Sequence, residues 1–182
     1  MVSNRTTIPD ANRRQVLMEA GYRCAVPTCR NILAIDIHHI VEVSEGGGND
    51  LSNLLALCPT CHALYHRGTI TKDAIYSWKG MVVALGHAFD QETIDNLLFL
   101  HKLQVGDDFL LISGDGVLKF ARLIGAGLAT FRADFRISLG PEIADQGYTV
   151  KLTGKGQMLI EAWFNGNRDA VKDTLSDVTD EK

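Results

Sequence analysis

The chain has 182 residues and a mass of 20.0 kDa, enough for one well-buried domain or for a small metal-held domain followed by a second of ordinary size. Hydrophobic residues make up 46% of it and charged residues 22%, which argues against wholesale disorder. A net charge of −4 argues against a protein that coats nucleic acid nonspecifically, although the charge is uneven: residues 1–80 carry +1 and residues 81–182 carry −5.

The first fourteen residues are polar and contain no apolar run that could serve as a signal peptide. No later segment reaches the length that a membrane-spanning helix needs. We therefore expect a cytoplasmic protein with no membrane partner. In that compartment covalent haem attachment and stable disulfides are both unexpected.

A short helix is predicted over residues 10–21, with Asp10 as its N-cap and Gly21 as its C-terminal stop. A block of cysteines and histidines follows and ends near Gly68. A further helix then begins with Thr69 or Thr71 as its cap. Its buried face is predicted from apolar residues at helical spacing, namely Ile75, Trp78, Met81 and Val82.

The pattern loosens between His87 and Glu92, where we place a domain boundary. The expected division is a domain over residues 1–88, a C-terminal α+β domain over residues 89–170, and an acidic tail over residues 171–182. Within the second domain the sequence predicts helices near 94–101 and 115–123, strands at 131–139 and 148–152, and a helix from Thr153 to Gly166.

The end of this domain, with two strands joined by a long loop and flanked by helices, resembles the wing of a winged-helix domain. Arg132 and Arg136 lie on the polar face of the first predicted strand. They contact a nucleic-acid backbone if the resemblance holds, or they protect an exposed strand from edge-to-edge pairing. The predicted fold class is α+β throughout.

The stretch LCPTCHALYHRG, residues 57–68, fits a c-type haem handle, a redox dithiol or half of a zinc site. The rest of the chain favours zinc, because a second thiol pair lies 28 residues upstream. Two close-spaced pairs are the usual ligands of a closed tetrahedral zinc site, and the haem and dithiol interpretations leave one pair unexplained. The four candidate ligands are Cys24, Cys29, Cys58 and Cys61.

Four of the six histidines lie between or just after these thiols. His62 and His66 are four residues apart on a predicted helix, so both imidazoles project from one face. His38 and His39 come from AIDIHHI, residues 34–40, which is typical of a strand. The histidines form a second cluster that a structural zinc site does not need. His87 and His101 lie outside the block and are assigned no role.

Residues 10–85 resemble the HNH nucleases, whose catalytic domain is a ββα-metal (His-Me) finger. The resemblance rests on the spacing of both cysteine pairs, on DIHHI at 36–40, on GGGNDLSNL at 46–54 and on CHALYH at 61–66. It implies His39 as general base, His38 and His62 as ligands of a catalytic divalent metal, and Asn53 as the residue that ties the loop down. His66 is an expected third ligand.

The resemblance implies a metal-dependent endonuclease that hydrolyses DNA, most simply duplex DNA, and leaves a 5′-phosphate and a 3′-hydroxyl. Imidazole ligands suit Zn²⁺, Mn²⁺ or Ni²⁺ better than Mg²⁺, although all four ions are candidates. Small nucleases of this type resemble parts of restriction and antiphage defence systems. The C-terminal domain would then recruit the nuclease to a substrate, a partner subunit, a second copy of the chain or an activating signal.

Two other functions fit the same residues. The chain is a non-catalytic, zinc-containing DNA-binding module if only the HNH fold is kept, or a sensor or assembly protein if the C-terminal half is the functional centre. Individual residues also have structural alternatives: His66 as a packing residue, His38 as a buried strand histidine, and Asn53 as a helix cap. Tyr65, Tyr76 and Trp78 are expected to pack rather than to stack on bases.

Overall fold

The computed structural model describes residues 7–138, 144–167, 169–171 and 173. The chain divides into two compact units. The first runs up to Ala88 and also takes in Ala162–Val171, and the second comprises Phe89–Glu161. Residues 162–170 were expected in the C-terminal domain, whereas the structure groups Ala162–Val171 with the first unit. The expected acidic tail lies almost entirely outside the described residues.

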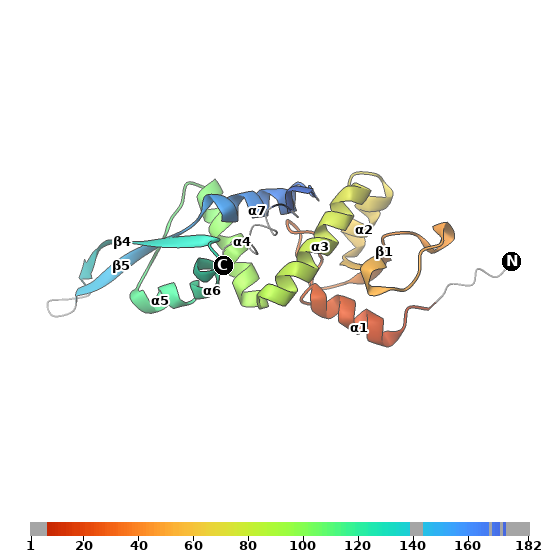
Figure 1. Cartoon of the computed structure of the whole chain (residues 1–182), viewed down its shortest axis with the longest axis horizontal. Coiled ribbons are helices and arrows are strands. Elements are labelled where there is room, and N and C mark those ends of the chain that lie inside the picture. The colour runs from red at the N-terminus through yellow and green to blue at the C-terminus, as the bar shows by residue number, and fades with distance from the viewer. Residues whose placement is uncertain (1–6, 139–143, 168, 172, 174–182) are drawn as a thin grey trace. The chain divides into compact units, whose positions relative to one another are not determined.

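The centre of the first unit is a two-stranded antiparallel sheet followed by a helix. β1 (Asp36–His39) pairs with β2 (Leu54–Leu57), so that His39 lies opposite Leu54. α2 (Pro59–His66) follows β2 directly and packs on both strands (Figure 1). Two short 3₁₀ turns, η1 (Val43–Glu45) and η2 (Leu51–Asn53), shape the loop between the strands. This is the ββα arrangement that the sequence predicts.

α1 (Asp10–Glu19) covers one side of the sheet. Its N-cap is Pro9 and no side chain caps it, so the expected cap at Asp10 is wrong by one residue. The Asp10 carboxylate lies in the first turn, where it still complements the helix dipole. Val16 and Ala20 are both 1% exposed and pack against Leu54 and Ala56 of β2. All four residues of β2 are buried.

α3 (Lys72–Ala88) closes the first unit. The Thr71 hydroxyl oxygen accepts a hydrogen bond from the Ala74 N–H at 3.2 Å, which confirms one of the two expected caps. The expected buried face is confirmed as well. Trp78 Nε1 donates to the Trp163 carbonyl at 2.8 Å, and the Lys79 ammonium pairs with Glu19 at 2.5 Å.

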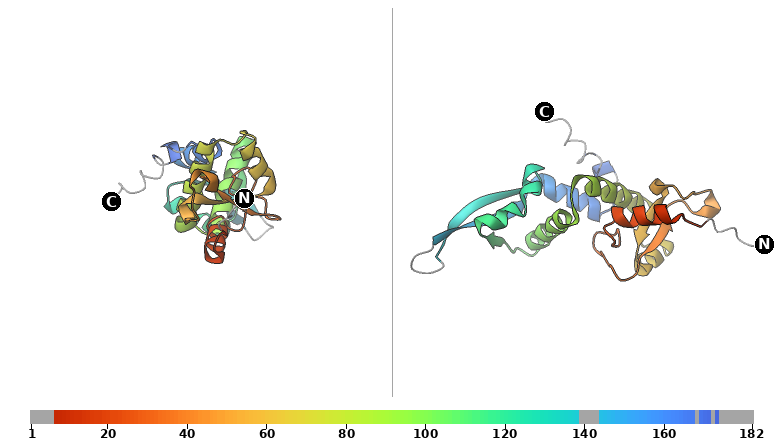
Figure 2. Two further views of the ribbon diagram at one scale, coloured as in Figure 1. Left: turned by 90° about the vertical axis from the view of Figure 1, so that its right-hand side faces the viewer. Right: turned by 90° about the horizontal axis from the view of Figure 1, so that it is seen from below.

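The second unit begins with α4 (Gln91–Val105), β3 (Leu110–Ile112), α5 (Gly114–Leu118) and α6 (Ala121–Gly125). The long strands β4 (Ala129–Ser138) and β5 (Ala144–Leu152) follow, and then α7 (Gly154–Phe164), whose last residues belong to the first unit. The sheet is antiparallel with the order β3-β5-β4. α5 packs on β5 and α6 on β4 (Figure 2). The second unit is therefore a mixed helix and sheet domain, as the sequence predicts.

Three sequence expectations for this unit need correction. β3 was not predicted. The single helix expected at 115–123 is two helices that meet at Phe120, a residue that is 4% exposed. The strand expected at 131–139 is β4, and the alternation of apolar and polar residues that predicts it does not mark a face buried along its whole length, since Phe131 is 47% exposed. Thr153, the expected start of the last helix, caps α7, because its hydroxyl oxygen accepts from the Gly156 N–H at 3.1 Å.

Candidate metal centres

The two cysteine pairs meet because the loop that carries the first pair is held to β2. The Ala25 N–H donates to the Ala56 carbonyl at 2.9 Å, which brings Cys24 beside the start of α2. Cys58 is the N-cap of α2, and its sulfur accepts from the Cys61 N–H at 3.5 Å. The four sulfur atoms lie within 4.8 Å of one another.

The sulfur geometry fits a single ion. Cys29 Sγ and Cys58 Sγ are 3.7 Å apart, close to the ~3.8 Å separation that four tetrahedral zinc–sulfur bonds of about 2.3 Å require. All four thiols are free of disulfides. A haem handle or a single dithiol needs only one pair, so the joint cluster favours a shared metal.

The thiols need a cation to ionise together. Burial raises the pKa of Cys24 to about 11, and burial followed by the charge of Cys24 also raises the pKa of Cys61. Burial acts in the same direction on Cys58, but hydrogen bonds from the Cys61 N–H and from the other three thiols outweigh it and lower the Cys58 pKa. Because metal ligands must be thiolates, a bound divalent cation would supply the charge that this buried cluster lacks.

A second cluster gathers three histidines from two elements. His38 comes from β1, and His62 and His66 come from α2, with ligand nitrogens within 4.8 Å of one another. His62 Nε2 and His66 Nε2 are 3.0 Å apart, and the rings of His38 and His62 are 5.0 Å apart. The one-turn spacing on α2 explains the first contact, and the packing of α2 on β1 explains the second.

His38 is the buried member of this cluster. Its side chain is 2% exposed, and its Nε2 has no hydrogen-bond partner among the described residues. Burial, followed by the charges of His62, His66 and His39, lowers the His38 pKa from 6.5 to about 4. The ring is therefore neutral at pH 7, which is the form that binds a metal. An orphaned buried nitrogen beside two more imidazoles fits a divalent ion.

His39 is the last residue of β1, and its contacts differ from those of His38. Its Nε2 lies 2.9 Å from the side-chain oxygen of Asn49. Neighbouring residues of a strand point to opposite faces, and His39 is not among the three histidines whose ligand nitrogens lie within 4.8 Å of one another.

Asn53 joins the two ends of the β1–β2 loop. Its side-chain oxygen accepts from the Val41 N–H at 2.8 Å, and its amide nitrogen donates to the carbonyls of Val41 and Gly48 at 3.1 and 2.8 Å. A side chain at Gly47 would collide with this arrangement, because its Cβ would lie 1.8 Å from the Val41 oxygen. The loop between His39 and Asn53 is thus closed by specific contacts.

Residues 23–68 match the family model of the HNH endonucleases. This range holds all the cysteines, histidines and asparagines of the site described above. The chain belongs to the HNH endonuclease family. Its HNH domain is the ββα part of the first unit, with four cysteines clustered for a metal site.

Two known proteins are similar to part of this chain. The chain is 39% identical over 61 residues to anaredoxin of Nostoc sp. (strain PCC 7120 / SAG 25.82 / UTEX 2576), which covers 34% of this chain and 79% of that protein. It is 37% identical over 41 residues to the type IV methyl-directed restriction enzyme EcoKMcrA of Escherichia coli (strain K12), which covers 22% of this chain and 15% of that enzyme. No solved structure gives a significant match.

The structure adds three residues that the sequence analysis left out of the HNH site. Asn49 contacts His39, the Tyr65 ring packs edge-on against His38 with centroids 4.5 Å apart, and an Asp36 oxygen lies 3.9 Å from His62 Nδ1. Strand periodicity signals Asp36, since residues 36 and 38 share one face of β1. Tyr65 was expected to pack, and its ring packs against His38 of the histidine cluster.

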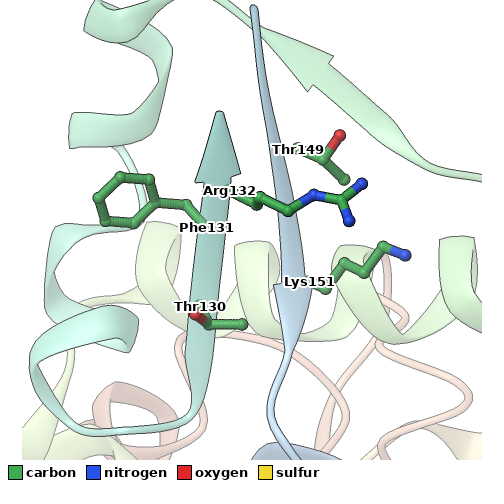
Figure 3. A pocket seen from close by; sticks show the side chains of 5 residues that line it. All are labelled: Thr130, Phe131, Arg132, Thr149 and Lys151. Atoms are coloured by element: carbon green, nitrogen blue, oxygen red, sulfur yellow. The ribbon is translucent and has the colours of Figure 1, made fainter. Parts of the chain in front are cut away.

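The second unit carries a hollow on its strand ribbon. It is lined by Arg132, Lys151 and two threonines, and also by Phe131, whose side chain points away from the other four (Figure 3). The Thr149 hydroxyl donates to the Asp134 carboxylate, which also accepts from Arg132. The side chain of Arg136 lies outside the described part.

Within the described ranges, no helix combines the length and the apolar character that a bilayer crossing requires.

Proposed function

We propose that this protein is a metal-dependent endonuclease that hydrolyses phosphodiester bonds of DNA. The observation that carries the proposal is the buried, neutral His38 with an orphaned Nε2 beside two further imidazoles. A purely structural histidine cluster gains nothing from leaving that nitrogen unpaired, because a buried polar group without a partner costs about 1–3 kcal/mol. A metal ligand explains it.

The roles that we propose agree with the contacts described above. His38, His62 and His66 hold the catalytic ion, which when bound would stabilise the negative charge that develops on the phosphate and on the leaving oxygen. His39 accepts a proton from the attacking water. Asn53 keeps the loop after β1 in place, so that His39 stays at the end of the strand. The thiol cluster binds a structural Zn²⁺ that holds the start of α2.

DNA is the proposed substrate because 41 residues of the chain are similar to part of a methyl-directed restriction enzyme. A role in restriction or antiphage defence follows from the same similarity. The shared segment spans 15% of that enzyme, so the recognition of any particular DNA modification does not carry over.

A plasmid-cleavage assay across Mg²⁺, Mn²⁺, Ni²⁺ and Zn²⁺ tests the proposal. We expect nicked or linear DNA with the wild type, and a loss of about 10²–10⁴-fold in rate with His39→Ala. His87→Ala is the matched control, since His87 lies on the exposed end of α3 outside the site. Equal cleavage by His39→Ala and wild type, with zinc content unchanged, would remove His39 as the base and favour a non-catalytic module.

The second unit is proposed to recruit DNA through the hollow on β4 and β5. Lys151 and Arg132 supply the positive charge there, and the exposed Thr130 supplies a hydroxyl. We expect Lys151→Ala to weaken binding to duplex DNA and to reduce its salt dependence by roughly one counterion. Lys155→Ala on α7 is the control lysine, and equal losses in both variants would count against a specific role for the hollow. Light scattering with and without DNA would show whether a second copy binds instead.

A further inference from the structure

The hydrogen bond between His39 and Asn49 determines which nitrogen of His39 is available as a base. A neutral imidazole carries one N–H and one bare nitrogen, and only the bare nitrogen accepts a proton. His39 Nε2 is 2.9 Å from Asn49 Oδ1. If the atom facing Nε2 is an acceptor, Nε2 must hold the proton.

The orientation of the Asn49 amide is fixed by a second contact. Its nitrogen, Nδ2, lies 3.2 Å from the carbonyl oxygen of Thr7, ahead of α1. A carbonyl oxygen only accepts, so the amide nitrogen must face Thr7 and the amide oxygen must face His39. In a flipped amide, Oδ1 would face the Thr7 carbonyl oxygen, and two acceptors cannot form a hydrogen bond. The amide nitrogen would then face His39 Nε2, which would clash with an N–H at that position.

We propose that Asn49 is a positioning residue that holds His39 as the Nε2–H tautomer and leaves Nδ1 as the catalytic base. This inference rests on the proposed nuclease function. In the reaction Nδ1 takes one proton from water as the water oxygen bonds to phosphorus. The bond from phosphorus to the leaving oxygen breaks, the electron pair stays on that oxygen, and solvent water protonates it.

The side chain of Asn49 is not needed merely to hold the loop. The backbone carbonyl of Asn49 accepts a hydrogen bond from Asn12 Nδ2 at 2.8 Å, which joins the loop to α1. Asn53 closes the same loop from the other side. Both contacts survive truncation of Asn49, so an effect of Asn49→Ala on His39 would report the side-chain amide.

The ¹⁵N chemical shifts of the His39 ring, measured near pH 8, report the tautomer directly. We expect the Nε2–H form in the wild type and a mixture of both forms in Asn49→Ala. Asn49→Asp keeps an acceptor toward Nε2 and should retain the Nε2–H form, although it loses the bond to Thr7. Asn12→Ala is the matched control, because it weakens the hold on the loop without touching His39.

In cleavage assays Asn49→Ala should lower kcat by about 10–100-fold with KM within about twofold of the wild type, and Asn49→Asp should recover most of that loss. An unchanged tautomer in Asn49→Ala overturns the assignment whatever the activity. If the wild type does not cleave DNA the nuclease proposal fails, and the ring shifts still decide whether Asn49 sets the tautomer. If Asn49→Ala does not fold, an Nδ1–H tautomer in Asn49→Asp overturns the assignment.

Discussion

At the scale of single residues, His38 makes the first unit sensitive to acid. Its pKa is lowered from 6.5 to about 4 by burial and by the neighbouring histidines. Between these values the unfolded chain binds a proton at His38 and the folded chain does not. The free energy of unfolding therefore falls as pH drops through this window, and the stabilisation is fully present above pH 6.5.

We expect His38 to contribute up to about 3 kcal/mol to this loss, from 1.36 kcal/mol per pKa unit. Urea unfolding at pH 7, 6, 5 and 4 measures it. Protons also compete for the cysteine metal site, so the wild type alone does not isolate His38. In His38→Gln, which cannot titrate, the slope between pH 6.5 and 4 should be shallower. Equal slopes in the two proteins would show that His38 is not buried in its neutral form.

Two adjacent glycines in the β1–β2 loop make a sharper residue-scale test. The Cβ of Gly47→Ala would lie 1.8 Å from the Val41 oxygen and 3.0 Å from Asn53 Nδ2, whereas Gly48→Ala would meet only an Asp50 oxygen at 3.5 Å. Thermal denaturation should show a loss of more than about 2 kcal/mol for Gly47→Ala and less than about 1 kcal/mol for Gly48→Ala. Similar losses would contradict the tight loop closure.

At the scale of elements, α2 depends on the thiol cluster at its first turn. α2 has eight residues, too few for an isolated helix to be stable, and Cys58 is its N-cap. Removing the metal with a chelator should therefore unfold β1, β2 and α2 together, and circular dichroism should lose helical signal. Cys58→Ser should behave like the chelated wild type. An unchanged spectrum after chelation would show that the metal does not hold this element.

Some features of these elements could be predicted from the sequence and others could not. The ββα order and both metal clusters were predicted because short spacings, such as the four residues between His62 and His66, fix geometry within one element. Asn49 was missed because its contact with Thr7 joins residues 42 apart. β3 has only three residues and is too short to show a period, and the split at Phe120 follows from tertiary burial of that ring.

At the scale of the whole molecule, the chain returns to its first unit after passing through the second. Ala162–Val171 belongs to the first unit, which contains the HNH domain. In this segment the Trp163 carbonyl accepts a hydrogen bond from Trp78 Nε1. Gly166 lies so close to α3 that an added Cβ would be 2.5 Å from the Ala74 Cβ. The family match at residues 23–68 contains no trace of this return. The first unit of this protein therefore includes a segment from near the end of the described chain.

We expect a fragment of residues 1–88 to be less stable than the full chain, because it exposes the surface of α3 that Trp163 covers. Thermal unfolding of the fragment and of the full chain, followed by circular dichroism, measures the difference. Trp78→Phe tests the contact within each protein. In the full chain it removes the hydrogen bond to Trp163 as well as ring volume, and in the fragment only the volume, so its cost should be larger in the full chain by about 1 kcal/mol. Equal costs in the two backgrounds, with equal melting temperatures, would show that the returning segment does not stabilise the HNH unit.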